Sequence, residues 1–156
     1  MKLNNSHLLN MVMIAVLIAL AVVGHRWSAQ LLPKADVTGV AEPGCDLQQR
    51  ACPAALPQGG RLELSITPRP IPLLQTLNIE VIATGIEARK VAVDLSGATM
   101  NMGYNRSELA GRGRGRYAGE ISLPVCVSGS MAWVATVIVE TDRQTIAVPY
   151  RFDTRH

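Results

Sequence analysis

The chain has 156 residues and a mild formal net charge of +3 at neutral pH. It contains a single phenylalanine and no basic run interleaved with aromatic residues, so its composition disfavours nucleic-acid binding. Residues 61–156 are enough for one folded domain with a single modest core.

The first expected element is an uncharged, apolar segment from Leu8 to Gly24, preceded by Lys2 and followed by Arg26. Spanning helices need about 17–25 apolar residues and signal-peptide cores about 7–15, and this segment lies where the two overlap. Good small-residue cleavage signals are missing behind it. We therefore expect residues 1–26 to form a retained membrane anchor, with a cleaved signal peptide as the alternative.

The charges on the two sides of the anchor are nearly balanced, so its orientation is inferred from the type of domain attached to it. A compact β module behind a single N-terminal span is typical of an exported domain. We expect a single-pass protein of a bacterial inner membrane with its domain in the periplasm.

Residues 27–60 contain no long periodic apolar pattern, and we expect an extended tether here. The segment from Cys45 to Cys52 is interpreted either as a locally closed loop or as a piece that packs on the domain. The tether contains four prolines: Pro33, Pro43, Pro53 and Pro57.

From residue 61 onward apolar residues recur with a period of two, which indicates half-buried strands. No convincing helix is expected after residue 26. Six or seven short strands without crossover helices predict an all-β domain, an immunoglobulin-like antiparallel β-sandwich. The expected strands cover residues 62–66, 77–81, 91–95, 117–123, 131–139 and 146–152.

The histidines do not support catalysis, because His7 and His25 flank the apolar segment and His156 ends the chain. A Ser-His-Asp or Cys-His centre inside the domain is therefore excluded, as is a histidine-rich zinc or Cu(II) site. No glycine-rich phosphate loop is present, and the acidic residues Asp94, Glu108, Glu120 and Asp142 are scattered. We do not expect an enzyme.

The remaining candidates for a functional site are the sulfur-containing side chains. Met100 and Met102 are two residues apart, so in extended backbone their thioethers point the same way. Thioethers are soft, uncharged ligands that suit Cu(I). Cys126 and Met131 precede and open the next strand and are further candidate ligands. The alternative is that these methionines fill gaps in the sandwich.

Four short stretches carry a family resemblance: Met-Asn-Met-Gly-Tyr-Asn-Arg at residues 100–106, Gly-Arg-Tyr-Ala-Gly at 115–119, Leu-Pro-Val-Cys at 123–126 and Met-Ala-Trp at 131–133. Together they resemble the small anchored bacterial proteins of the FixH and YtkA-like kind. The resemblance covers about half of the domain. It implies a role in copper supply or respiratory oxidase assembly, with a respiratory oxidase subunit or another membrane protein as partner. The resemblance supports Met100 and Met102 as copper ligands, and it supports Met131 in this role more weakly. The lack of a nearby histidine departs from a complete ligand set.

Three cysteines leave one unpaired if a disulfide forms outside the cytosol. We favour a bridge between Cys45 and Cys52, whose six intervening residues allow the ends to meet. Cys126 would then be free, as a third copper ligand, a redox contact or a buried apolar residue. The alternative is that Cys126 pairs with one of the other two.

Arg112, Arg114 and Arg116 alternate with glycines. In an extended hairpin this spacing puts the three guanidinium groups on one side, where they would contact anionic lipid or an acidic partner. The alternative is a solvated hairpin tip. Two functional interpretations result: a membrane-tethered protein that binds Cu(I), and a metal-free β-sandwich that serves as an interaction or scaffolding module of a membrane complex.

Overall fold

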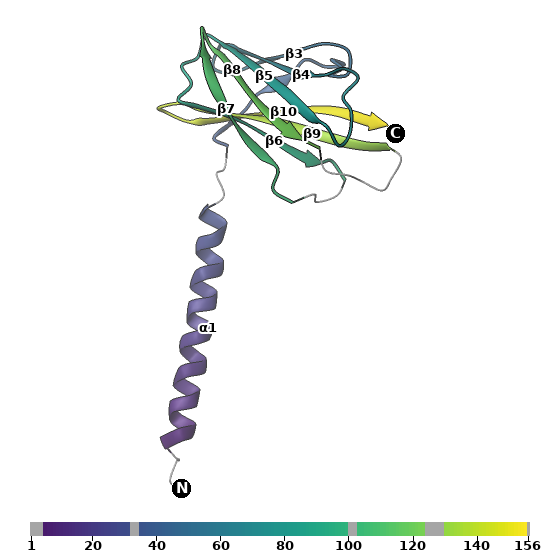
Figure 1. The fold of residues 1–156 in the computed structure, drawn as a ribbon. Coiled ribbons are helices and arrows are strands. Elements are labelled where there is room, and N and C mark those ends of the chain that lie inside the picture. Colours follow the sequence, from purple (N-terminus) through teal and green to yellow (C-terminus); the bar gives the residue numbers. More distant parts are fainter. Residues whose placement is uncertain (1–4, 32–34, 100–102, 124–129, 156) are drawn as a thin grey trace. The chain divides into compact units, whose positions relative to one another are not determined.

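The computed structural model describes residues 5–31, 35–99, 103–123 and 130–155 (Figure 1). The chain forms two compact units, Met1–Lys34 and Ala35–His156. The first unit contains one helix, and the second contains every strand that the structure describes.

The helix α1 covers Asn5–Leu31, so it continues past the predicted end of the anchor at residue 26. Its described apolar side chains are exposed on all sides, with Leu9 at 74% and Leu20 at 63%. In the described part of the chain, no helix has both the length and the apolar character needed to cross a membrane.

The second unit is an all-β sandwich, as predicted, and its layers are joined so that it is nearly closed like a barrel. The strands follow the order β1-β10-β9-β6-β7-β8-β5-β4-β3-β2. Strand β7 pairs with β6 through its first half and with β8 through its second half, and so links the two layers (Figure 1). The strand pairs are antiparallel except for β1 with β10, which is parallel. The strands are β1 (Val37–Thr38), β2 (Val40–Ala41), β3 (Cys52–Ala55), β4 (Arg61–Thr67), β5 (Thr76–Thr84), β6 (Lys90–Gly97), β7 (Arg106–Gly113), β8 (Arg116–Ser122), β9 (Ser130–Glu140) and β10 (Thr145–Arg155).

The core lies between the two layers and follows the predicted alternation. Every second residue of β9 is buried, starting at Met131, and this strand lies between β6 and β10. Trp133, Val137 and Tyr150 are among the inward-facing side chains with 0–1% exposure. The sequence did not predict β7, because Gly111 and Gly113 and the charged residues around them give no alternating pattern.

The structure differs from the predicted tether over residues 27–60. The compact β unit begins at Ala35 rather than at residue 61, and the segment 35–60 supplies β1, β2 and β3. Leu47 is 0% exposed and belongs to the core. These strands contain only two to four residues each, which is too short to give a periodic signal.

The segment from residue 45 to residue 52 packs on the domain and is fixed there by polar contacts. Arg69 Nε donates to the Leu47 carbonyl oxygen at 3.1 Å. The Gln48 side chain accepts from the Ile71 backbone N–H at 2.6 Å and donates to the Asp153 carbonyl oxygen at 2.5 Å. The segment is therefore bound to β10 and to the loop that follows β4.

Gly39 marks the point where the chain crosses from one layer to the other. Its N–H donates to the Ala147 carbonyl oxygen at 2.9 Å, whereas the next two residues form β2 and pair with β3. A Cβ at this position would lie 2.7 Å from Val148 Cγ2 and 2.8 Å from Leu56 Cδ2. The crossing therefore requires a residue without a side chain.

Candidate functional site

Described residues that flank two of the predicted sulfur segments, together with Met131, lie at one end of the sandwich, where β6 ends and β9 begins. We call it the methionine end and define it by the described residues 97–99, 103–105 and 130–133. Gly97 is the Cα partner of Trp133, and the Ala98 N–H donates to the Ala132 carbonyl oxygen at 2.9 Å. The backbone is thus held beside the start of β9 two residues before position 100.

The chain just before β7 is also held at the methionine end by a hydrogen bond. Asn105 Nδ2 donates to the Ser122 carbonyl oxygen at 3.0 Å, close to the end of β8. Met100, Met102 and Cys126 lie outside the described residues.

Met131 is the one candidate ligand whose side chain the structure describes. It is 6% exposed, faces the core, and is the Cα partner of Thr154 on β10. Two residues further along β9, the Trp133 indole donates to Thr154 Oγ1 at 3.0 Å. Met131 therefore belongs to the core cluster next to the methionine end, a position that fits both interpretations made from the sequence.

The cysteines of the first segment are joined to each other. A disulfide links Cys45 and Cys52, with Cα atoms 5.7 Å apart. This is the pairing favoured from the sequence, and it leaves neither sulfur available as a thiolate ligand. Within residues 35–99, 103–123 and 130–155, no three His, Cys, Asp or Glu side chains gather in a way that would hold a metal ion.

The three arginines lie in a hairpin, as the sequence predicted, but they do not belong to one extended segment. Arg112 lies in β7, Arg114 in the turn with a φ of 52°, and Arg116 in β8. The chain reverses direction at Arg114, so the spacing of two does not describe one extended segment. Arg112 lines a small cavity together with Glu80. Arg116 forms an ion pair with Glu80, with 2.6 Å between Nη2 and Oε1.

Two of the scattered acidic residues form ion pairs with basic residues. Glu108 Oε2 lies 2.8 Å from Lys90 Nζ, and this hydrogen bond raises the pKa of the lysine. Asp142 pairs with Arg89 at 3.2 Å. Desolvation of the half-buried Asp94 raises the pKa of its carboxyl group, while the nearby positive charge of Arg106 lowers it.

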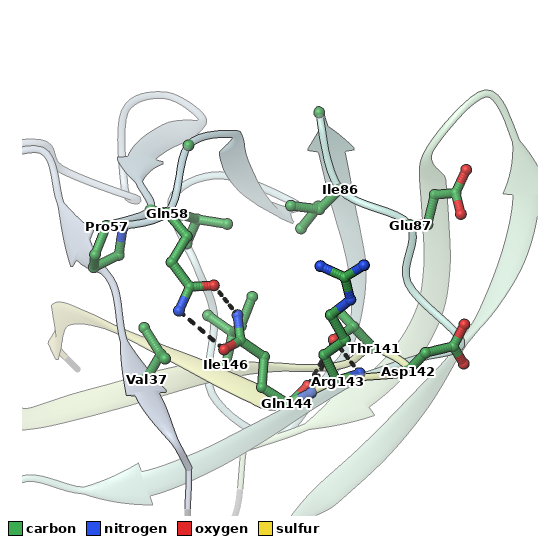
Figure 2. Close-up of a pocket in the computed structure, with 13 residues that line it drawn as sticks. Val37, Pro57, Gln58, Ile86, Glu87, Thr141, Asp142, Arg143, Gln144 and Ile146 are labelled. Carbon is green, nitrogen blue, oxygen red and sulfur yellow. Dashed lines mark hydrogen bonds between the residues drawn. The ribbon is translucent and has the colours of Figure 1, made fainter.

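The opposite end of the sandwich contains a cavity of about 380 Å³ that the sequence did not indicate (Figure 2). The side chains of Gln58 and Gln144 are paired through two reciprocal hydrogen bonds, one of them 2.9 Å long from Gln58 Nε2 to Gln144 Oε1. Figure 2 shows Arg143 reaching into the cavity between this pair and Ile86. Among the predicted site residues that the structure describes, none lines this cavity. The lining consists of Val37, Leu56, Pro57, Gln58, Gly59, Gly85, Ile86, Glu87, Thr141, Asp142, Arg143, Gln144 and Ile146.

This cavity offers recognition groups rather than reactive ones. The two glutamine amides satisfy each other, and the Thr141 hydroxyl donates to the Gln144 carbonyl oxygen at 2.9 Å. Arg143 has no ion-pair partner among the described residues. The amide pair joins positions 86 residues apart in the chain, so no local sequence pattern could have revealed it.

Comparison of the chain with protein-family models, with curated proteins and with solved structures found no match. The resemblance to FixH and YtkA-like proteins therefore remains a prediction from short motifs.

Proposed function

We propose that this protein holds Cu(I) at the methionine end of the sandwich and passes it to a partner. The observation that carries the proposal is the hydrogen bond from Ala98 to Ala132, together with the Gly97–Trp133 register. It keeps the segment leading to Met100 and Met102 next to the start of β9, where Met131 lies. In the proposal the thioethers of Met100 and Met102, which lie outside the described residues, bind the ion together with that of Met131.

A site made of thioether ligands suits the transfer of Cu(I) to a partner rather than its storage. Thioethers are neutral and soft, so they bind Cu(I) without needing to lose a proton. A partner site that contains thiolates or imidazoles would remove the ion by ligand exchange. The sequence resemblance implies that this partner is a respiratory oxidase subunit or another membrane protein.

We also propose that the protein is attached to a bacterial inner membrane with its sandwich in the periplasm. The Cys45–Cys52 disulfide supports an oxidising compartment. Although no described helix meets the requirements of a span, the exposed apolar side chains around α1 need an apolar environment in place of water. Carbonate extraction of isolated membranes tests this attachment, which is wrong if the chain is released.

The strand pairing within the two layers supports a finer fold assignment. We propose an immunoglobulin-like sandwich, supported by the antiparallel pairs β4–β5 and β5–β8 in one layer and β6–β9 and β9–β10 in the other. The molecule differs from a sandwich of two separate sheets because β7 pairs with a strand of each layer and so nearly closes the structure.

A Cu(I) competition titration against a chromogenic chelator tests copper binding. The full chain in detergent is titrated without oxygen, beside Met100→Leu/Met102→Leu and a matched control, Met11→Leu/Met13→Leu in α1. Stoichiometric binding that is lost only in the first variant supports the proposal. Equal binding by all three proteins, or no binding, overturns it.

The second candidate is a metal-free interaction module. It is favoured by two large exposed apolar side chains, Leu74 at 66% and Tyr104 at 83%. The two side chains lie close in sequence to two contacts of Ser122. Thr76, two residues after Leu74, is the Cα partner of Ser122, and Asn105, which follows Tyr104, donates a hydrogen bond to the Ser122 carbonyl oxygen. If neither methionine variant loses function in cells, this candidate is supported.

A further inference from the structure

The outer edge of β10 is covered over only a small part of its length. β10 pairs with β9 along all of its eleven residues, whereas β1 pairs only with Ile146 and Ala147. The N–H groups of Asp36 and Gly39 donate to the carbonyl oxygens of Thr145 and Ala147, at 2.8 and 2.9 Å. Past Gly39 the chain leaves this edge and joins β3 in the other layer.

The direction of the backbone groups beyond Ala147 is set by the strand geometry. Successive residues of a strand present their N–H and C=O groups to alternate sides. Since Thr145 and Ala147 face β1, the next residues that face this edge are Pro149, Arg151 and Asp153. Proline has no N–H, so the edge presents the Pro149 carbonyl, both backbone groups of Arg151 and both of Asp153.

These groups are largely without partners inside the chain. Among the described residues, neither the N–H nor the C=O of Arg151 has a hydrogen bond on this side. The Asp153 carbonyl oxygen accepts from Gln48 Nε2 at 2.5 Å, a side-chain amide in the place that a neighbouring strand would occupy. The edge therefore has unused donors and acceptors in the pattern that a strand needs.

Two cavities border this edge and share part of their lining. One measures about 440 Å³ and contacts residues 149–151. The other measures about 900 Å³ and contacts residues 151–153. The larger cavity also reaches Ala98 and Ala132, which lie beyond β10 from this edge. Gly44, Cys45 and Arg151 line both, so the two cavities join into one groove beside β10. We call it the β10 groove.

The far wall of the β10 groove is the segment 38–48, which the Cys45–Cys52 disulfide and the Arg69–Leu47 hydrogen bond fix in place. This wall limits what can enter. A second copy of the sandwich would bring a whole sheet against the edge, so the wall disfavours it more strongly than it disfavours a single extended chain.

We propose that the β10 groove binds an extended segment of another protein, which pairs with β10 at residues 149–153 as an additional strand. Main-chain hydrogen bonds to Arg151 would give the affinity. The lining of the groove carries the carboxylates of Glu42, Asp46 and Asp153 and the cation Arg151, and Glu42 is already paired with Arg50 at 3.0 Å. Asp46 and Asp153 therefore leave the groove with more negative than positive charge. We therefore expect a neutral to basic peptide.

The test uses phage-displayed random decapeptides selected on the full chain in detergent. Arg151→Pro removes the central one of the two N–H groups that face the groove, and it leaves the hydrogen bonds to β9 intact because the neighbouring residues make those. Arg151→Ala is the matched control, since it removes the side chain and keeps the N–H. We expect selected peptides to bind the proline variant at least about fivefold more weakly and the alanine variant within about twofold.

Backbone hydrogen exchange of the wild-type chain gives a second readout that does not depend on the folding of the proline variant. Bound peptide should slow exchange of the Arg151 amide. The proposal is overturned if no peptide is selected, if peptides bind both variants equally, or if the Arg151 amide is not protected. A concentration-dependent dimer that Arg151→Pro abolishes would assign the edge to a second copy and also overturn it.

Discussion

Trp133 Nε1 donates a hydrogen bond of 3.0 Å to Thr154 Oγ1, and the two residues are 0% and 1% exposed. The bond crosses from β9 to β10 within the core. Thr154 is also the Cα partner of Met131, so this contact helps to fix the start of β9. It links the packing of the sandwich to the position of a candidate copper ligand.

Thr154→Val should destabilise the fold. The substitution preserves the shape of the side chain but leaves the buried indole N–H without an acceptor, which costs about 1–3 kcal/mol of unfolding free energy. Urea unfolding followed by circular dichroism measures the change. Thr154→Ser keeps the hydroxyl and should lose less than the valine variant; a larger loss in the serine variant would show that the hydroxyl does not matter.

Leu47→Ala tests whether the segment 45–52 is part of the folded unit. Truncation of a leucine that is 0% exposed should lower the unfolding free energy by about 2–5 kcal/mol. Val40→Ala is the control, because Val40 is 68% exposed and should change stability by no more than about 0.5 kcal/mol. Equal stability of wild type and Leu47→Ala would instead support a loose tether.

Gly39→Ala should destabilise the crossing between the layers. The added methyl group lies 2.7 Å from Val148 Cγ2, and overpacking of this kind costs about 1–3 kcal/mol. Gly111→Ala is matched to it, since the nearest atom to its added Cβ is 3.8 Å away. Thermal unfolding of the two variants should separate them clearly, and a common melting temperature would contradict the clash.

Asp94 makes a pH-dependent contribution whose sign is set by its raised pKa. Burial places the folded pKa above the ordinary value of 3.8, so the folded state binds more protons in the interval above that pH. The contribution of Asp94 to stability therefore falls as the pH rises through this interval. Asp94→Asn should be more stable than wild type at pH 7, with the advantage shrinking toward pH 3. An advantage that grows on acidification would contradict the assigned cause.

The fold was predictable where strands are long enough to repeat their pattern. Strands β4, β5, β9 and β10 bury alternate residues over most of their length, and β6 buries Val91, Val93 and Leu95 as predicted together with Ala92. In β8 only Ile121 is fully buried. The predicted strands coincide with these six, and only the segment 117–123 runs one residue past its strand. Strands β1 and β2 have two residues each, and their pairing depends on the Gly39 crossing, which is a tertiary feature. The tether interpretation was wrong over residues 35–60 for this reason.

The candidate site was predictable only in part. A spacing of two in Met100 and Met102 indicates shared direction, but only the tertiary fold brings position 98 to Ala132 and so close to Met131. For Arg112, Arg114 and Arg116 the same spacing does not define a shared direction, because a turn at Arg114 interrupts the extended backbone. Contacts such as Gln58 with Gln144 leave no local signal at all.

The measurement that tests the copper site most directly is a methyl NMR spectrum of the full chain, labelled at the methionine methyl groups, with and without Cu(I). Cu(I) is diamagnetic, so each of the six methionines gives an interpretable signal. We expect the Met100 and Met102 methyls to shift strongly and Met131 to shift less, while Met11 and Met13 in α1 stay unchanged. Unchanged signals from Met100 and Met102 in the presence of stoichiometric Cu(I) would contradict the proposed site.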